Sequence, residues 1–222
     1  MQPTVTRTNA GYMKLKDIHA YLIERAEQFC PELLEHLHAH GPMFIPRRLS
    51  ESLFLFLARM EAAKTLSAEL TDSIWARLLR LSEQGGEARA DAFDREFDSG
   101  GFAPKLTQEQ RDVLRHLRQL FLDGLIDEQR LHQGDYQMVR KVVSGLWGYA
   151  DWSADMTAIF YFGLPDIWCE GDSSLQSGLR QILHDDHHEN MEEIIAAFSP
   201  FRTYLALHIW RFLDPHPQNE SA

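Results

Sequence analysis

Apolar side chains recur every three or four residues along most of this chain, the spacing that gathers them on one face of an α-helix. The first such run covers 16–40, and Pro31 within it marks a kink or the first turn of a second helix. The same spacing predicts helices over 50–60, 66–81, 107–123, 135–147, 152–163, 173–184, 187–198 and 200–213. We find neither the alternation typical of a half-buried strand nor a repeat of fixed period. The pattern predicts an all-α protein.

Polar segments without helical periodicity separate these helices. Residues 1–13 are polar and aperiodic, and we expect them to form a flexible arm before a single domain over 14–222. The acidic segment 82–104 carries Gly-Gly twice and is expected to be a surface connection with at most a short helix. Thr107 is followed three residues later by Gln110, the spacing of a capping box, so a helix should begin there.

Composition narrows the class of protein. With 222 residues and 44% hydrophobic content, the chain can bury a sizeable core. Its two cysteines cannot form a disulfide framework or a four-cysteine metal site, and we expect free thiols. The sequence has no apolar run long enough to span a membrane and no signal-peptide pattern, which favours a soluble cytoplasmic protein.

The charge balance argues against a general polyanion binder. The chain has 33 acidic and 22 basic residues, which gives a formal net charge of -11. Binding to nucleic acid depends on neutralising phosphates with lysine and arginine. Any nucleic-acid face must therefore be a local patch supported by backbone dipoles.

Residues 142–183 hold the most informative pattern of the chain. They read as a helix, a tight glycine-containing turn, an apolar helix and an irregular loop that ends just before another helix. The turn is LWGYADWSADM over 146–156, and the loop is LPDIWCEGD over 164–172. By residue type alone, Asp172 at the start of the last helix is expected to be an N-cap.

This stretch resembles the signature of the helix-hairpin-helix base-excision DNA glycosylases, and in particular 3-methyladenine DNA glycosylase II. In that family a turn Leu-x-Gly-Ile-Gly-x-Trp-Thr-Ala precedes a Gly/Pro-Asp loop. Residues 54–78 resemble its early helix pair, 199–210 resemble its C-terminal block, and 106–114 match more weakly. The resemblance spans roughly 30–214. It implies two packed helical lobes, formed by about 48–145 and by the flanking terminal helices, with the hairpin at 142–160 and an active-site cleft between the lobes.

The resemblance also assigns roles to single residues. Asp172 falls where the family keeps its catalytic aspartate, which stabilises positive charge on the sugar as the glycosidic bond breaks. Trp152, Trp210 and Met156 fall at positions of the pocket for a flipped base, where indole faces suit an electron-poor alkylated purine. Ordinary core packing is the alternative for each tryptophan. Trp152 replaces the lysine of members that also nick the strand, so no lyase step is expected.

The hairpin is expected to hold the DNA backbone. The resemblance implies that peptide N–H groups around Gly148, Tyr149 and Ala150 bind phosphate, helped by K⁺ or Na⁺ at the carbonyls of Leu146 and Gly148. No other cofactor is implied. The chain departs from the family signature because Ala150 replaces the second glycine and Asp151 adds a negative charge. We expect Asp151 to be the N-cap of the following helix.

Other polar residues near these blocks receive simpler interpretations. The family often inserts Gln-Gln near the gap left by the flipped base, and Lys64 and Thr65 stand there in this chain, as a wedge or a phosphate contact. Arg59 and Glu61, in an apolar helix, are expected to form a buried or interhelical polar pair. Three histidines alternate at a helix end, where positive charge is favourable beside the terminal carbonyls: His36, His38 and His40.

Three functions follow as hypotheses. The first is a monomeric, monofunctional glycosylase that excises alkylated purines from damaged double-stranded DNA. The second is a catalytically silenced scaffold that binds DNA weakly or a protein partner, motivated by the net charge and the departures at 64–65 and 150–151. The third is a metal-dependent helical enzyme. It would use a polar cluster that more simply begins a solvated acidic helix: His184, Asp185, Asp186, His187, His188 and Glu189.

Overall fold

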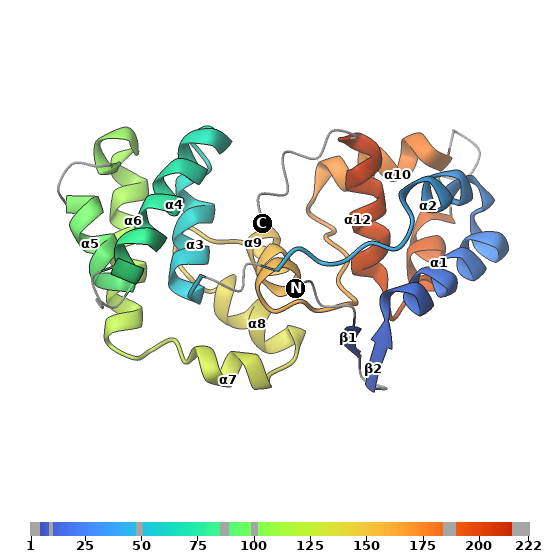
Figure 1. Cartoon of the computed structure of the whole chain (residues 1–222), viewed down its shortest axis with the longest axis horizontal. Helices are drawn as coiled ribbons and strands as arrows, with labels where there is room; N and C mark the ends of the chain where they lie inside the picture. The colour runs from blue at the N-terminus through green and yellow to red at the C-terminus, as the bar shows by residue number, and fades with distance from the viewer. Residues whose placement is uncertain are drawn as a thin grey trace. The chain divides into compact units, whose positions relative to one another are not determined.

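The computed structural model describes residues 5–8, 11–47, 51–84, 89–98, 102–183 and 190–214. The chain folds into two compact units. The middle unit is 47–162, and the terminal unit combines 1–46 with 163–222. Both units are mostly helical, as the periodicity predicts (Figure 1).

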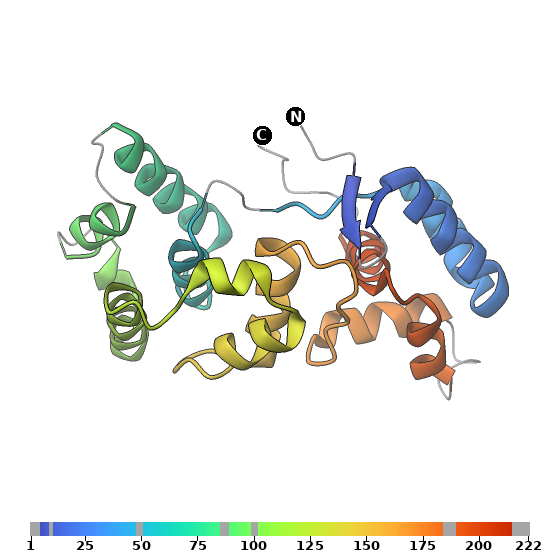
Figure 2. The same ribbon diagram turned by 90° about the horizontal axis from the view of Figure 1, so that it is seen from below.

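The terminal unit is built around a buried C-terminal helix. Its elements are β1 (Val5–Thr8), β2 (Gly11–Lys14), α1 (Leu15–Phe29), the 3₁₀ turn η1 (Pro31–Leu33), α2 (Leu34–His40), α10 (Ser173–Leu183), α11 (Met191–Ala197) and α12 (Arg202–Leu213). Helix α12 packs against α10 and α2. In Figure 2, α12 is drawn in red and is seen nearly end-on, beside these two helices. Gly178 on α10 allows this helix to lie close to α12, because a Cβ atom at position 178 would lie only 2.7 Å from Cγ2 of Ile209 on α12.

The expected flexible arm contains a short β-hairpin instead. Strand β1 pairs antiparallel with β2, in a register that places Val5 opposite Lys14 and Thr8 opposite Gly11. Valine and threonine favour extended backbone, but a strand of four residues is too short to show an alternating pattern. The sequence-based expectation of no strand was therefore wrong at this point.

The middle unit is built around α3, which is buried along most of its length. Its elements are α3 (Leu53–Ala62), α4 (Ala68–Gln84), α5 (Arg89–Asp98), the 3₁₀ turn η2 (Ala103–Lys105), α6 (Gln108–Leu122), α7 (Glu128–Gln133), α8 (Tyr136–Val143), α9 (Asp151–Met156) and the π-helical turn η3 (Thr157–Tyr161). The indole of Trp75 on α4 donates to the carbonyl of Leu55 (3.1 Å). Helices α4, α5 and α6 all pack on α3.

The acidic segment 82–104 contributes to the core of this unit. Phe93 and Phe97 on α5 are buried and lie against Phe102, with ring centroids 5.6 and 5.5 Å from it. The expectation of a surface connection was wrong here, because the apolar face of a short helix was hidden among charged residues. The charged face still pairs, since Arg118 on α6 binds Asp94 through two guanidinium nitrogens.

Helix starts follow the predicted chemistry where it is local. The capping box at the start of α6 is confirmed, with Gln110 N–H donating to Thr107 Oγ1 (3.2 Å) and Thr107 N–H donating to Gln110 Oε1 (3.1 Å). Pro31 opens the first turn of η1, the second of the two expected roles. Helix α7, capped by Asp127, was not predicted because its six residues are too few for periodicity to show.

The terminal unit encloses several polar groups. His208 on α12 is buried, and its Nδ1 lies 3.2 Å from Nδ1 of His40 on α2. Burial, together with the nearby charges of His36 and Arg211, lowers the pKa of His40 and so opposes the positive charge that was expected beside the terminal carbonyls of α2.

The two cysteines are also buried in this unit, with no disulfide bond between them. Burial raises the pKa of Cys30 to about 12. Among the described residues, no helix combines the length and apolarity needed to cross a bilayer.

Candidate functional site

The turn between α8 and α9 is closed by its own backbone and requires a glycine. Leu146 N–H donates to the carbonyl of Val143, and Tyr149 N–H donates to the carbonyl of Leu146, both at 3.1 Å. Gly148 has φ of 88°, in the left-handed region that L side chains rarely adopt. A Cβ atom on Gly148 would lie 2.7 Å from Cγ1 of Val113 on α6. Backbone angle and space therefore both disfavour a larger residue at this position.

We expect Gly148→Ala to lower the free energy of unfolding by about 2 kcal/mol, since the new Cβ is strained in φ and collides with Val113. Urea unfolding followed by circular dichroism measures the change. The same substitution should cost less in a Val113→Ala background, where the collision is relieved. An equal cost in both backgrounds would show that the contact with Val113 is not the cause.

Tyr149 ties the turn to the core of the middle unit. Its side chain is buried and its hydroxyl donates to the carbonyl of Leu57 on α3 (2.9 Å). Burial, and to a lesser extent the charge of Glu61, raises the pKa of Tyr149 well above its ordinary value. Gly148 and Ala150 on either side are exposed. Of the three residues whose peptide N–H groups were expected to bind phosphate, Tyr149 already donates its N–H to the Leu146 carbonyl within the turn.

Lys64 and Thr65, expected as a wedge or phosphate contact, both bond within the middle unit. The Lys64 ammonium donates to Glu61 Oε2 (2.6 Å) and to the carbonyl of Gly148 (2.7 Å). Thr65 Oγ1 donates to Gln110 Oε1 (2.9 Å). The Lys64 side chain is 47% exposed, so its ammonium lies at the surface of the turn.

The expected pairing of Arg59 with Glu61 was wrong. Arg59 donates to Glu51 Oε1 (2.9 Å) and also binds Asp72, while Glu61 takes Lys64 as its partner. Arg59 and Glu61 are two residues apart on one helix, and side chains at that spacing point to different faces. Both charges are therefore paired, as expected, but each pairs with a residue other than the one predicted.

Asp151 is not the N-cap of α9. Ala150 holds that position, and Asp151 is the first residue of the helix. Its carboxylate accepts from Arg140 on α8, with Nη2 at 2.6 Å and Nε at 3.3 Å. Bonding to Arg140 outweighs the small desolvation and lowers the pKa of Asp151. The negative charge that departs from the family signature is thus balanced by a neighbouring guanidinium.

The predicted pocket residues of the middle unit lie on α9. Trp152 is 43% exposed and Met156 is buried. Trp147, which the sequence analysis did not single out, is also exposed at the turn and packs edge-on against His116 of α6, with ring centroids 6.0 Å apart. Two indoles therefore flank the turn at the surface of this unit.

Asp172 stands at the start of α10 and does cap that helix. Its Oδ1 accepts from the Leu175 N–H (2.8 Å) and from the Ser174 hydroxyl (2.6 Å). The side chain is half-buried. The N-cap interpretation therefore describes the geometry of this carboxylate. These bonds fix the orientation of the carboxylate.

The loop before Asp172 is fastened to the start of α12. Asp166 accepts from Arg202 Nε (2.7 Å), Arg202 Nη2 (3.0 Å) and the Ser199 hydroxyl (2.9 Å). Burial opposes ionisation of Asp166, but these bonds outweigh it and lower its pKa. Both segments belong to the motif blocks, but their spacing does not predict that they bind each other.

Thr203 completes this fastening from inside the terminal unit. It is fully buried; its hydroxyl donates to the carbonyl of Leu164 (2.8 Å) and accepts from the Ile167 N–H (2.9 Å). The loop that leads to Asp172 is thus held by both side-chain and backbone groups of α12. An Arg-Thr pair that opens a helix 36 residues after a Pro-Asp pair was the only sequence signal.

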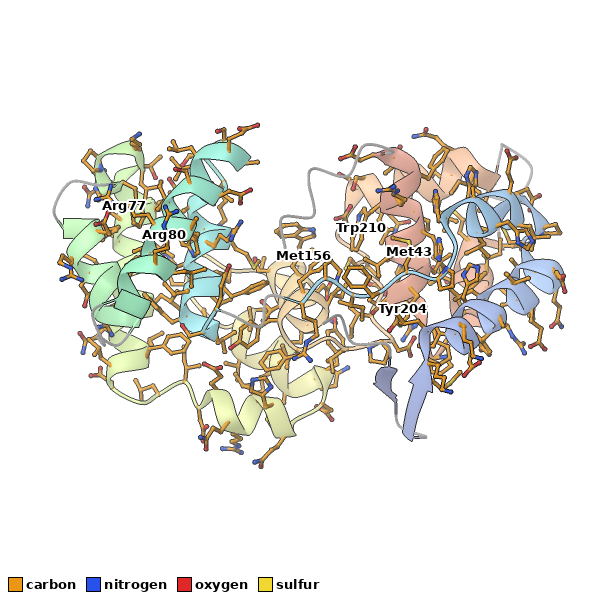
Figure 3. The ribbon with its side chains drawn as sticks, viewed as in Figure 1. Met43, Arg77, Arg80, Met156, Tyr204 and Trp210 are labelled. Atoms are coloured by element: carbon orange, nitrogen blue, oxygen red, sulfur yellow. The ribbon has the colours of Figure 1, made fainter. Side chains whose placement is uncertain are left out.

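Trp210 lies near the end of α12 and is half-buried. Figure 3 shows Trp210 and Tyr204 on α12, with Met43 on the extended segment that follows α2. Asp172 and Trp210 thus belong to two helices that pack on each other in the terminal unit, while the turn, Trp152 and Met156 belong to the middle unit. Within the described residues, no group of three or more potential ligands is placed to hold a metal ion. The cluster at 184–189 lies outside the described residues.

Comparisons with known proteins identify the fold. No family model matches this sequence, and no curated protein matches it either. Among solved structures it resembles a DNA-3-methyladenine glycosidase from Bacillus halodurans, with a TM-score of 0.68, 20% identity, and coverage of 86% of this chain and 88% of that chain. It also resembles the 3-methyladenine DNA glycosylase of Schizosaccharomyces pombe in complex with abasic DNA, with a TM-score of 0.68, 18% identity, and coverage of 88% and 95%. The two helical units together therefore have the fold of these glycosylases, as the motif resemblance implied.

Proposed function

We propose that this chain, which has the fold of the 3-methyladenine DNA glycosylases, is a monofunctional DNA glycosylase that excises alkylated purines from duplex DNA. The observation that carries the proposal is the match of fold over most of both chains. The position of Asp172 supports it, because the motif resemblance expects a catalytic carboxylate at the start of this helix. The sequence motifs and the fold support the same class of enzyme.

The proposed reaction is hydrolysis of the N-glycosidic bond of a flipped nucleotide. As the bond between C1′ and the base nitrogen breaks, its electron pair leaves with the base and positive charge develops on the sugar. Asp172 stabilises that charge, and water adds to C1′ to leave an abasic site. Because the Leu175 N–H and the Ser174 hydroxyl already orient this carboxylate, little reorganisation is needed in the transition state.

The base is proposed to stack on tryptophan. Trp152 and Trp210 present large aromatic faces, which attract a cationic alkylated purine by stacking and by cation–π interaction. Stacking of this kind contributes about 1–3 kcal/mol per base. Met156 is proposed as a third residue that contacts the base. Position 152 has no amine to attack C1′, so the phosphodiester backbone is expected to stay intact.

The DNA backbone is proposed to meet the turn through Gly148 and Ala150, whose surroundings are compatible with a phosphate. Asp151 is balanced by Arg140, and the Lys64 ammonium lies at the surface of the same turn. The net charge of -11 nevertheless opposes long-range attraction of DNA. Binding should therefore be weak and strongly dependent on salt.

The departures from the family signature favour a second candidate, a silenced scaffold that binds DNA without cleaving it. Ala150 and Asp151 alter the turn, and Lys64 is already bonded within the protein. Such a scaffold would keep the fold and lack base release. Measurement of base release therefore distinguishes the two functions, whereas measurement of DNA binding does not.

Base release is the direct test of the proposed function. We expect the wild-type protein, in single turnover at low salt, to release base from duplexes that carry 3-methyladenine, 7-methylguanine or hypoxanthine. Strand scission should appear only after the product is heated in alkali, because the enzyme leaves an abasic site. Strand breaks before alkali would contradict the monofunctional reaction. Binding without release from any of these lesions would favour the scaffold.

A further inference from the structure

The carbonyl oxygen of Gly148 and the carboxylate of Glu61 share one cation, the ammonium of Lys64. Its Nζ lies 2.7 Å from the Gly148 oxygen and 2.6 Å from Glu61 Oε2. The Glu61 side chain is only 4% exposed, and a buried carboxylate requires a compensating charge. The ring centroid of Tyr149 lies 5.7 Å from the same nitrogen, within the range of cation–π attraction. Lys64 thus connects the end of α3 to the turn.

This arrangement does not fit the monovalent ion that the motif resemblance implies at the carbonyls of Leu146 and Gly148. The Leu146 oxygen accepts the Tyr149 N–H at 3.1 Å, and the Gly148 oxygen accepts the Lys64 ammonium. An ion bound at the Gly148 oxygen would lie within a few ångströms of that ammonium. Repulsion between two unit positive charges at such a distance opposes its binding.

We propose that Lys64 takes the place of the ion, so that the turn is held by a cation that belongs to the chain. Glu61 balances its charge from the buried side, and Glu61 Oε2 lies beside the turn, 3.4 Å from the position that a Cβ atom on Gly148 would occupy. A tethered ammonium has a high effective concentration and needs no free ion in solution. The conformation of the turn is therefore independent of which monovalent salt is present.

The first test measures stability, and it does not depend on the proposed function. Thermal unfolding is recorded at equal ionic strength in potassium, sodium and choline chloride. The unfolding midpoint of wild type should be the same in all three salts. Lys64→Met should lower it by about 5 °C in choline, because Glu61 and the Gly148 carbonyl lose their shared partner. Potassium or sodium should restore part of that loss. Lys105→Met, at an exposed site, is the matched control and should behave as wild type.

A second variant separates loss of charge balance from a general packing defect. In the Lys64→Met background, Glu61→Gln removes the unbalanced buried charge, so it should recover stability and abolish the preference for potassium or sodium over choline. If Lys64→Met matches the control in every salt, Lys64 does not hold the turn. If the wild-type midpoint rises in potassium or sodium over choline as much as that of Lys64→Met, an ion binds beside Lys64. Either result overturns the inference.

The second test measures binding to DNA and rests on the proposed function. The probe is a fluorescent duplex with a tetrahydrofuran abasic-site analogue, titrated with protein in each of the three salts. Wild-type dissociation constants should agree within about twofold among the salts at equal ionic strength. Those of Lys64→Met should rise about tenfold in choline and less in potassium. Absence of wild-type binding would contradict the proposed function alone, since the stability measurements judge Lys64 separately. Wild-type affinity that changes between potassium and choline as much as that of Lys64→Met would overturn the inference.

Discussion

Replacement of Asp172 by asparagine should reduce single-turnover base release by about a hundredfold or more, with little change in stability. The reason lies in the two roles of this side chain. As an N-cap, its Oδ1 accepts from the Leu175 N–H, and an asparagine oxygen caps a helix about as well. As the proposed catalytic group it supplies a negative charge, which asparagine lacks. The substitution therefore removes the chemistry and keeps the helix start.

The comparison needs a control for the loss of a capping carboxylate. Asp127→Asn provides it, because Asp127 caps α7 through the Arg130 N–H (2.9 Å) and has no proposed role in the reaction. Its rate of base release should equal that of wild type. Unfolding midpoints of both variants should stay close to the wild-type value. Equal rates for wild type and Asp172→Asn would exclude Asp172 as the source of catalysis.

Acid should destabilise the terminal unit through His208. Burial, followed by the charges of His40, His19 and His36, lowers the pKa of His208 to about 3. A histidine with a depressed pKa in the folded state takes up protons more readily when unfolded. Its contribution to stability is therefore complete above the unfolded pKa of about 6.5 and is lost as pH falls from there towards 3. The expected loss from His208 alone is about 2 kcal/mol between pH 7 and pH 5.

The neighbours of His208 act in the same direction. The pKa of His40 is lowered by burial and by the charges of His36 and Arg211, and that of His19 by burial and by His38. Nε2 of His208 and Nδ1 of His19 are buried with no hydrogen-bond partner in the described part of the chain. Protonation of any of these rings places a charge where little compensates it.

Urea unfolding at several pH values tests this expectation. His208→Gln removes the buried ring that titrates and keeps a polar group beside His40, so its stability should depend less on pH between 7 and 5. His116→Gln removes an exposed histidine of the middle unit and should leave the wild-type slope unchanged. If the free energy of unfolding falls equally for His208→Gln and for wild type between pH 7 and pH 5, protonation of His208 is not the cause of the acid destabilisation.

The helices were predictable from the sequence because their information is local. Apolar periodicity located the long helices, and the pair Thr107 and Gln110 gave the start of α6 to the residue. Short elements were missed where too few residues carried the pattern, as in β1, β2 and α7. The burial of Phe93 and Phe97 was missed because charged residues surround them in the sequence.

The candidate site was predictable in its residue types and less so in its bonds. The motif identified Gly148, whose φ and surroundings disfavour a side chain. The bond from Lys64 to the Gly148 carbonyl joins residues 84 positions apart, and no spacing rule predicts it. The pairing of Asp151 with Arg140 likewise depends on how α8 and α9 meet across the turn. Such contacts depend on the three-dimensional arrangement of the helices. The motif indicates the fold but not these individual bonds.

The placement of the two cysteines gives the terminal unit a chemical label of its own. The chain has only Cys30 and Cys169, and both are buried in that unit. A thiol reagent needs access to the sulfur and reacts with its thiolate form. Both thiols are buried, and burial raises the pKa of Cys30, so the reaction requires the surrounding helices to separate. The rate of thiol modification therefore reports local opening of the terminal unit, while opening of the middle unit gives no signal. A change in that rate on adding DNA would show how binding alters the unit that carries Asp172.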